Sequence, residues 1–384
     1  MLLLVLESLF FTSITIVVLF YIFFLSLLYY YNRKKEDNSG SLDFFFPDIS
    51  IIIPIFNEGK IIQRKIENLL KMDYPRNKLE VIFVDGGSTD DTGVIISRYK
   101  SNHSFINLVK QGRRKGYNAA VFDGFQKSTK EIIVITQADA LYEPDALKYL
   151  VRHFKDHAIG AVTGKQLILN RNKGVATELE GSYRRFYDFV RSAETQMDSP
   201  FDIKGEICAL RREICANLLL NNPELQTEAC VDCCLSCQAR LEGYKTIFEP
   251  KAKYYEQVTS TLIDRLKQQL RRGTILIESL LIYKNMLFNK KYGLFGIIIL
   301  PAHLFMLIVL PWLFILGSIT FPFIFINYPY IFLFFILTIL SVILVKPLFV
   351  LSFLLSQIAL AAATVRVVMG RESQIIEQLP STRE

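Results

Sequence analysis

An apolar segment near the start of the sequence is the first constraint on the fold. Residues 2–31 carry one charged side chain, Glu7, and exceed the roughly 20 residues that cross a bilayer as a helix. No basic stretch precedes this segment and no small-residue cleavage site is evident, so we expect a retained anchor at residues 1–32. The basic sequence Arg33-Lys34-Lys35 follows directly. By the positive-inside rule, it predicts that the chain after it lies in the cytoplasm.

Further apolar segments lie near the other end of the sequence. Residues 294–316 and 319–345 contain no charged side chain, and residues 348–368 contain a single arginine. We therefore expect about three membrane helices within residues 293–369, followed by a tail at 370–384, in a multi-pass protein of the cell membrane. Three crossings would place the C-terminus outside, and two would place it inside.

The composition indicates a soluble domain between the two apolar ends of the chain. Hydrophobic residues make up 51% of the 384 residues, yet 21% charged residues is too many for a pure bundle of membrane helices. Roughly 260 residues lie between the apolar ends, enough for one large α/β core. The net charge of +7 fits a basic bias at the cytoplasmic face of a membrane. No aromatic–basic motif accompanies this charge, so we expect no nucleic-acid partner.

All six cysteines fall between Cys208 and Cys237. A disulfide framework would spread them through a small secreted chain, so we predict reduced thiols in a cytosolic domain. Cys230-x2-Cys233, followed at once by Cys234-x2-Cys237, has spacing similar to that of zinc ligands. These pairs lack the intervening loop of zinc modules, so we expect buried helix thiols and keep a cysteine-bound metal module as an alternative.

Strand-like stretches alternate with helical patterns through the central region. The expected strands are residues 49–54, 79–84, 106–109, 132–136 and 159–163. This alternation predicts an α/β domain over residues 45–255, with a Rossmann-like, doubly wound, mostly parallel sheet and right-handed crossovers. Asn57 is expected to cap the helix that follows the first strand.

Two of the expected strands lead into acidic residues. Ligands of open α/β sheets bind at the carboxyl ends of the strands, which makes Asp85 and Asp139 candidate site residues. Gly86 and Gly87 after the first of them permit a tight turn close to a ligand.

Several segments, in this order, resemble the donor half of the family 2 glycosyltransferases, which have the GT-A fold. They are Pro54-Ile-Phe-Asn57-Glu58, Val84-Asp85-Gly-Gly-Ser-Thr-Asp-Asp-Thr92, Lys115-Gly116 and Thr136-Gln-Ala-Asp139. The resemblance covers about residues 48–275. Each motif alone is weak, whereas their order and spacing together are specific.

The second half of the region resembles the acceptor side of the same family. The matching segments are Gly205-Glu-Ile-Cys-Ala-Leu-Arg211-Arg212-Glu213, Asp232 with Gly243-Tyr244 eleven residues later, and Gln268-x-x-Arg271-Arg272. The last resembles the Gln-x-x-Arg-Trp motif of the membrane-bound polymerising members. It lies in residues 256–292, whose alternation of apolar and basic residues predicts interfacial amphipathic helices.

The resemblance implies a site for a nucleotide-sugar, with a UDP-sugar as the expected donor. Asp85 and Glu58 would receive the base and ribose, in a site that also includes Pro54, Asn57 and Ala138. Lys115 would meet the pyrophosphate. Asp139 would hold Mg²⁺ or Mn²⁺, which as a Lewis acid stabilises the departing diphosphate.

The chain departs from the family pattern at several positions. Gly86 replaces the second acid of the usual Asp-Asp-Gly, and Gln137 replaces the first acid of the usual Asp-x-Asp. The second change leaves the nucleotide phosphates as the main metal ligands. Arg272 stands in place of the motif tryptophan, which removes an acceptor-stacking ring. Cys230-Val231 before Asp232 replace the family's Thr-Glu.

The resemblance assigns the acceptor side to five further residues and a base. Asp232 would be the general base of inverting transfer, taking the proton of an acceptor hydroxyl as its oxygen attacks the anomeric carbon. The residues expected to face the acceptor or the diphosphate are Gly205, Arg211, Gln268, Arg271 and Arg272.

We therefore expect a metal-dependent, inverting glycosyltransferase that acts on a hydroxyl of a lipid-linked or growing glycan. A polyprenyl (dolichyl)-phosphate sugar synthase is the alternative within the family, because a phosphate acceptor needs no general base. An alternative of another class is a membrane pore or transporter with a degenerate nucleotide-binding domain, which the incomplete Asp-x-Asp and Gln-x-x-Arg-Trp motifs favour.

Overall fold

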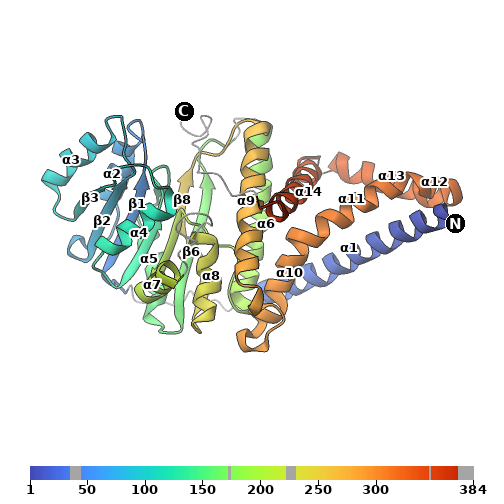
Figure 1. Ribbon diagram of the computed structural model, residues 1–384, viewed down its shortest axis with the longest axis horizontal. Coiled ribbons are helices and arrows are strands. Elements are labelled where there is room, and N and C mark those ends of the chain that lie inside the picture. Colours follow the sequence, from blue (N-terminus) through green and yellow to red (C-terminus); the bar gives the residue numbers. More distant parts are fainter. Residues whose placement is uncertain (35–44, 172–173, 222–230, 346, 371–384) are drawn as a thin grey trace.

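The computed structural model describes residues 1–34, 45–171, 174–221, 231–345 and 347–370. An α/β domain lies at one end of the molecule and a group of apolar helices at the other, with two long helices between them (Figure 1). Figure 1 shows the N-terminus at the far end of the apolar helices, remote from the sheet.

The α/β domain is built on one eight-stranded sheet within the described residues, in the order β3-β2-β1-β4-β7-β6-β8-β5. The strands are β1 (Ile49–Ile55), β2 (Leu79–Asp85), β3 (Ile106–Lys110), β4 (Ile132–Thr136), β5 (Leu141–Tyr142), β6 (Ile159–Ile168), β7 (Ile207–Arg211) and β8 (Lys245–Glu256). Strands β3, β2, β1 and β4 are parallel, as are β6 and β8, whereas β7 runs antiparallel to both of its neighbours. The predicted mostly parallel sheet is confirmed, and β5, β7 and β8 are additions to it.

Helices cover both faces of the sheet, which is why its central strands carry apolar side chains on both faces. Because side chains alternate along a strand, Ile51 and Ile53 of β1 join one buried cluster and Ile52 joins another. Gly124 packs against Ile52, where an added Cβ would come within 2.5 Å of the isoleucine Cγ2. The covering helices are α2 (Ile62–Leu70), α3 (Thr92–Asn102), α4 (Tyr117–Lys127), α5 (Ala146–Val151), α7 (Arg212–Asn221) and α8 (Val231–Leu241).

Two long helices, α6 (Val175–Met197) and α9 (Leu262–Ile282), separate the sheet from the apolar helices (Figure 1). Thr261 starts α9 by accepting the backbone N–H of Asp264, which satisfies one of the unpaired donors of a helix start. The amphipathic pattern expected within residues 256–292 corresponds to α9. Its polar side faces α6, and part of its length packs against the apolar helix α14 (Pro347–Val368).

Within the described residues, three helices are long and apolar enough to cross a membrane, judged by length and composition: Leu2–Arg33 (α1), Phe295–Asn327 and Val350–Val368. Residues 295–345 form two successive helices, as the sequence predicted, but the break between them does not lie near residue 317, because the first helix continues to Asn327. The break occurs at Tyr328, because the residue before a proline is disfavoured in the α conformation. The helix that follows, α13 (Pro329–Val345), has 17 residues.

The helix Phe295–Asn327 is widened at two places. π-helical segments at Phe295–Ile299 and Phe305–Val309 each end two residues before a proline, Pro301 and Pro311. Proline lacks the N–H that would continue the regular hydrogen-bond pattern, and a wider turn accommodates this loss. Between them, a ring nitrogen of His303 lies 2.7 Å from the Glu194 carboxylate and so links this helix to α6.

Candidate active site

The loops after β1 and β2 are joined to each other at the carboxyl edge of the sheet. The backbone N–H of Asn57 donates to Ser88 Oγ (2.9 Å), and Asn57 Oδ1 accepts the N–H of Thr89 (2.8 Å). Asn57 has φ 53°, a left-handed conformation that asparagine tolerates better than most residues. The expected cap at Asn57 is wrong, because α2 begins five residues later and Asn57 instead fixes the loop after β2.

Asp85 is the last residue of β2 and is 5% exposed. Its Oδ1 accepts the backbone N–H of Ser88 at 2.8 Å, which closes the tight turn that the two glycines permit. Gly87 adopts φ 87° in this turn, as predicted for a glycine there. The carboxylate is therefore held in one orientation at the strand end.

Glu58 belongs to the same joined loops. Its backbone N–H donates to Thr92 Oγ1 (2.9 Å), and the next N–H, of Gly59, donates to Asp90 Oδ2 (2.9 Å). Pro54 lies on β1 opposite Val84 of β2. The structure therefore brings together four predicted donor residues on two adjacent strands and their loops: Pro54, Asn57, Glu58 and Asp85.

The basic loop before α4 lies beside these residues. The guanidinium of Arg114 stacks over the Phe56 ring at 4.3 Å from its centre. Lys115 has a side chain 45% exposed and lies 3.3 Å from Asp123, which also accepts a hydrogen bond from Gln111 (2.7 Å). Lys115 is thus an accessible cation near the two joined loops.

Asp139 follows β4, the strand on the other side of β1. It is half-buried, and Ala138 beside it is 3% exposed. The Thr136 hydroxyl donates to the carbonyl of Glu206 (2.9 Å), which places Gly205 and Glu206 next to the end of β4. The order β2-β1-β4 therefore puts Asp85, Glu58 and Asp139 along one edge of the sheet.

The fit of a divalent metal depends on Asp139. Among the described residues, no group of three or more His, Cys, Asp or Glu side chains could hold a metal ion. A single carboxylate with the diphosphate of a bound nucleotide suits Mg²⁺ or Mn²⁺, which commonly take one or two protein carboxylates and substrate phosphates. The residues present therefore fit a metal that binds together with its nucleotide.

A buried charge cluster joins α6 to α9. The Glu180 carboxylate lies 2.9 Å from Arg184, 2.9 Å from Arg272 and 3.5 Å from Arg265. These three guanidinium groups outweigh burial and lower the pKa of Glu180 to about 2. Predicted acceptor residues Gln268 and Arg271 lie half-buried on the same helix as Arg272.

Two glutamates near the strand ends were not predicted. Glu206 follows Gly205, and Glu256 ends β8 and accepts a hydrogen bond from Gln166 (2.5 Å). Burial, and the negative charges of Glu206 and Asp139, raise the pKa of Glu256. An acid at the end of a strand was the signal used for Asp85, but β8 was not among the predicted strands.

Arg211 is not brought to this group. It ends β7 opposite Ile132, the first residue of β4, whereas Asp139 follows the last. Its guanidinium donates to the carbonyls of Ile159 (2.9 Å) and Phe154 (3.1 Å) at the opposite edge of the sheet. The reason is the antiparallel direction of β7, which carries the end of the motif away from its start at Gly205.

Comparisons with known proteins agree with this geometry. The family model of Glycosyl transferase family 2 matches residues 50–219. These residues are a family 2 glycosyltransferase domain. The poly-beta-1,6-N-acetyl-D-glucosamine synthases of Staphylococcus aureus (strain COL) and Staphylococcus epidermidis are 26% and 25% identical to the chain over 224 residues. The match covers 58% of this chain, and the chain spans about half the length (53%) of these curated relatives.

A solved structure shows the same fold over nearly the whole chain. It is the mannosyltransferase PcManGT from Pyrobaculum calidifontis in complex with GDP-Man and Mn²⁺, with a TM-score of 0.77 and 24% sequence identity. The superposition covers 96% of this chain and 100% of that one, so it includes the apolar helices. The expected GT-A architecture with additional apolar helices is confirmed.

Asp232, the predicted base of the glycosyltransferase domain, lies in the first turn of α8. Its side chain lies outside the described residues, as do the side chains of Cys230 and Cys233. Cys234 and Cys237, further along α8, are buried, in agreement with the expectation of buried helix thiols there.

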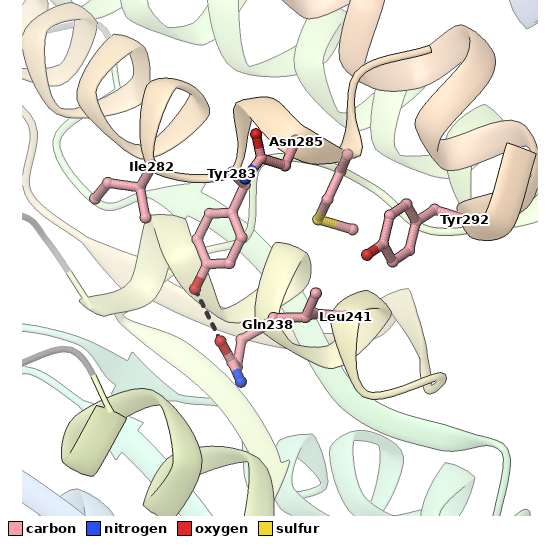
Figure 2. A pocket seen from close by; sticks show the side chains of 7 residues that line it. Gln238, Leu241, Ile282, Tyr283, Asn285 and Tyr292 are labelled. Carbon is pink, nitrogen blue, oxygen red and sulfur yellow. Dashed lines mark hydrogen bonds between the residues drawn. The ribbon is translucent and has the colours of Figure 1, made fainter. Parts of the chain in front are cut away.

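A pocket of about 250 Å³ lies at the opposite edge of the glycosyltransferase domain (Figure 2). Its lining residues are Gln238, Leu241, Ile282, Tyr283, Asn285, Met286 and Tyr292. The Tyr283 hydroxyl donates to Gln238 Oε1 (3.0 Å) across it. Because it lies beside the last turns of α8 and α9 and none of the predicted site residues lines it, it is not the donor site.

Proposed function

We propose that the chain transfers a sugar, with inversion, from a nucleotide-sugar to an acceptor presented at the membrane. The observation that carries this proposal is the position of Asp85, Glu58 and Asp139 on three neighbouring strands at one sheet edge. Strands β2 and β4 lie on either side of β1 and are therefore two strand spacings, or roughly 10 Å, apart. This distance suits a ligand the size of a nucleoside diphosphate. Both the family match and the printed names of the relatives support this reading.

Each predicted donor residue has a proposed role in binding the nucleotide-sugar. Asp85, held by Ser88, would accept the imide proton of uracil or contact the ribose, and Glu58 would lie beside it. Lys115 would neutralise part of the diphosphate charge. The two joined loops after β1 and β2 reduce the ordering that donor binding requires, since Asn57 already fixes them.

Asp139 is the proposed ligand of Mg²⁺ or Mn²⁺. When bound, the ion would neutralise charge that develops on the departing diphosphate. Thr136 and the neighbouring Glu206 carbonyl hold the end of β4 in place, so Asp139 is presented from a rigid strand end. The Mn²⁺ in the name of the solved relative supports this assignment.

For the acceptor, we propose a hydroxyl of a lipid-linked or growing glycan, with Asp232 as the base. The support is the resemblance of the segment around Asp232 and the name of the staphylococcal relatives, which are polysaccharide synthases. A polyprenyl phosphate is the second candidate. The three arginines around Glu180, close to the apolar helices, favour it because they could bind an acceptor phosphate.

We propose that the glycosyltransferase domain lies on the cytoplasmic side of a membrane crossed by several helices. The basic end of α1 at Arg33 and Lys34 lies on the domain side of that helix. Asn32 donates to the Phe189 carbonyl (3.1 Å) and so attaches the same end of α1 to α6. Basic residues at this end agree with the positive-inside rule.

The experiment that tests the proposal is a screen of UDP- and GDP-sugars for diphosphate release by the purified full chain. Product mass, read by mass spectrometry, would identify the acceptor and show whether transfer repeats. We expect release with at least one donor and none from Asp139→Ala. No release with any donor, combined with solute flux through reconstituted vesicles, would favour the pore or transporter alternative.

A further inference from the structure

Lys65 interrupts the buried apolar face of α2. That face consists of Ile62, Ile66 and Leu69, and Lys65 lies among them with 0% of its surface exposed. Burial lowers the pKa of Lys65 to about 7, against the opposing effect of the negative charge on Asp139. Such a break in the pattern of a helix is expected where function, rather than stability, selects the residue.

The amine of Lys65 contacts both ends of the turn that carries Asp139. It donates to Thr136 Oγ1 (3.1 Å) at the end of β4 and to the carbonyl of Ala140 (2.5 Å) immediately after Asp139. It also lies 4.6 Å from the centre of the Tyr142 ring, whose face attracts a cation. The turn is therefore connected to α2 on either side of Asp139.

A second side chain of α2 extends this support. Asn68 lies three residues after Lys65, on the same face of the helix. Its amide group donates to the Tyr142 carbonyl (2.8 Å) and accepts the Tyr142 N–H (2.9 Å). Two polar side chains of α2 thus fix the backbone from residue 136 to residue 142, with Lys65 closest to the proposed metal ligand.

We propose that Lys65 is a positioning residue that holds the Asp139 carboxylate in the orientation required to bind a divalent metal together with a nucleotide diphosphate. The inference rests on the proposed function, since it assigns Asp139 to the metal. Gln137 occupies the place where the family has its other acid, so the orientation of the single remaining carboxylate decides the affinity. Lys65 acts through the turn, because its hydrogen bonds are to Thr136 and Ala140.

The test is a titration of the purified full chain with Mn²⁺ in the presence of UDP or GDP, in which electron paramagnetic resonance measures free Mn²⁺. Lys65→Met keeps the length of the side chain and removes the amine. We expect its dissociation constant for Mn²⁺ to rise roughly tenfold, since loss of a group that orients a metal ligand typically weakens binding 10- to 100-fold. The midpoint of thermal unfolding should stay close to that of the wild type.

Two further variants make the test decisive. Lys71→Met places the same change at the exposed end of α2 and should leave the Mn²⁺ affinity unchanged. Thr136→Val removes one acceptor of Lys65 and should weaken Mn²⁺ binding to a smaller extent. If Lys65→Met does not fold, the Mn²⁺ affinity of Thr136→Val tests the inference in its place. Wild-type affinity in both Lys65→Met and Thr136→Val would overturn the inference, as would a wild type that binds no Mn²⁺.

Binding and transfer are measured separately in this design. A wild type that binds Mn²⁺ with the nucleotide but transfers no sugar from any donor would contradict the proposed function. In that case the Mn²⁺ titrations of the two variants still decide whether Lys65 positions Asp139.

Discussion

Arg272 of α9 donates to the carboxylate of Glu180 on α6 over 2.9 Å, and so joins the two helices that separate the sheet from the apolar helices. Arg184 and Arg265 approach the same carboxylate. One glutamate thus compensates three buried or partly buried arginines. The sequence predicted Arg272 as an acceptor contact, which stays a prediction, whereas the structure shows it in the junction between the domain and the apolar helices.

Replacing Glu180 should therefore destabilise the protein. Glu180→Gln leaves the arginines uncompensated, and removal of one partner from a buried ion pair typically costs about 3–5 kcal/mol. Glu178→Gln, an exposed change on the same helix, is the matched control and should be close to neutral. Thermal unfolding in detergent measures both. A Glu180→Gln midpoint equal to that of the wild type would show that the cluster contributes nothing to stability.

The low pKa of Glu180 predicts that part of the free energy of unfolding depends on pH in the acid range. The folded-state pKa of Glu180, about 2, lies below its ordinary value of 4.5, so its contribution is fully present above pH 4.5. It is lost as the pH falls from about 4.5 towards 2, because the unfolded chain takes up the proton first. The stability difference between wild type and Glu180→Gln should shrink across this window. A constant difference would contradict the assigned pKa.

Asp139 should be required for transfer. Asp139→Ala removes the proposed metal ligand, and excess EDTA removes the metal, so both should abolish release of the nucleoside diphosphate. Gln137→Asp restores the acid that the family usually has there and should lower the Mn²⁺ concentration at half activity. Full activity in excess EDTA would contradict the metal assignment. An unchanged Mn²⁺ titration in Gln137→Asp would show that this position does not face the metal.

Asp85 should act in donor binding. Asp85→Asn retains an acceptor for the Ser88 N–H and removes the charge, so the turn after β2 should persist while the contact to the base or ribose weakens. We expect a higher dissociation constant for the donor, measured by calorimetry, with an unchanged midpoint of thermal unfolding. Equal donor affinity in wild type and variant would remove Asp85 from the site.

The parallel half of the sheet was predictable because its strands are short runs of β-branched residues between helical patterns. The apolar run leading to Val84-Asp85 shows both the strand and the candidate acid. By contrast, β7 contains Cys208 and Arg211, and β8 mixes lysines, tyrosines and glutamates, so neither resembles a buried parallel strand. Their directions depend on pairing with β4 and β6, which sequence periodicity does not reveal.

The same limit explains the site residues that were misplaced or missed. The motif from Gly205 to Arg211 is continuous in sequence, but an antiparallel strand carries its two ends to opposite edges of the sheet. The helical period places Lys65 on the buried face of α2. The sequence around it does not indicate which groups its amine would contact. Those partners, Thr136 and Ala140, lie more than 70 residues away in the chain.

Asp232 separates the two acceptor classes. If the acceptor is a hydroxyl, its proton must leave during the attack, and a positioned base contributes typically 10²–10⁴-fold. Asp232→Asn keeps the shape of the side chain and removes the base. We therefore expect kcat to fall at least about a hundredfold while the dissociation constant of the donor stays nearly unchanged. A phosphate acceptor is already ionised, so for a polyprenyl phosphate the loss should be small.

Donor affinity and transfer rate must be measured on the same Asp232→Asn sample, so that misfolding is not taken for lost chemistry. Asp264→Asn, a change of the same kind in the first turn of α9, is the control. It should leave transfer within a few-fold of the wild type. If Asp232→Asn binds the donor and also transfers within a few-fold of wild type, Asp232 is not the base. The arginines around Glu180 would then be the leading candidates to bind an acceptor phosphate. In that case Arg184→Gln should raise the KM for that acceptor.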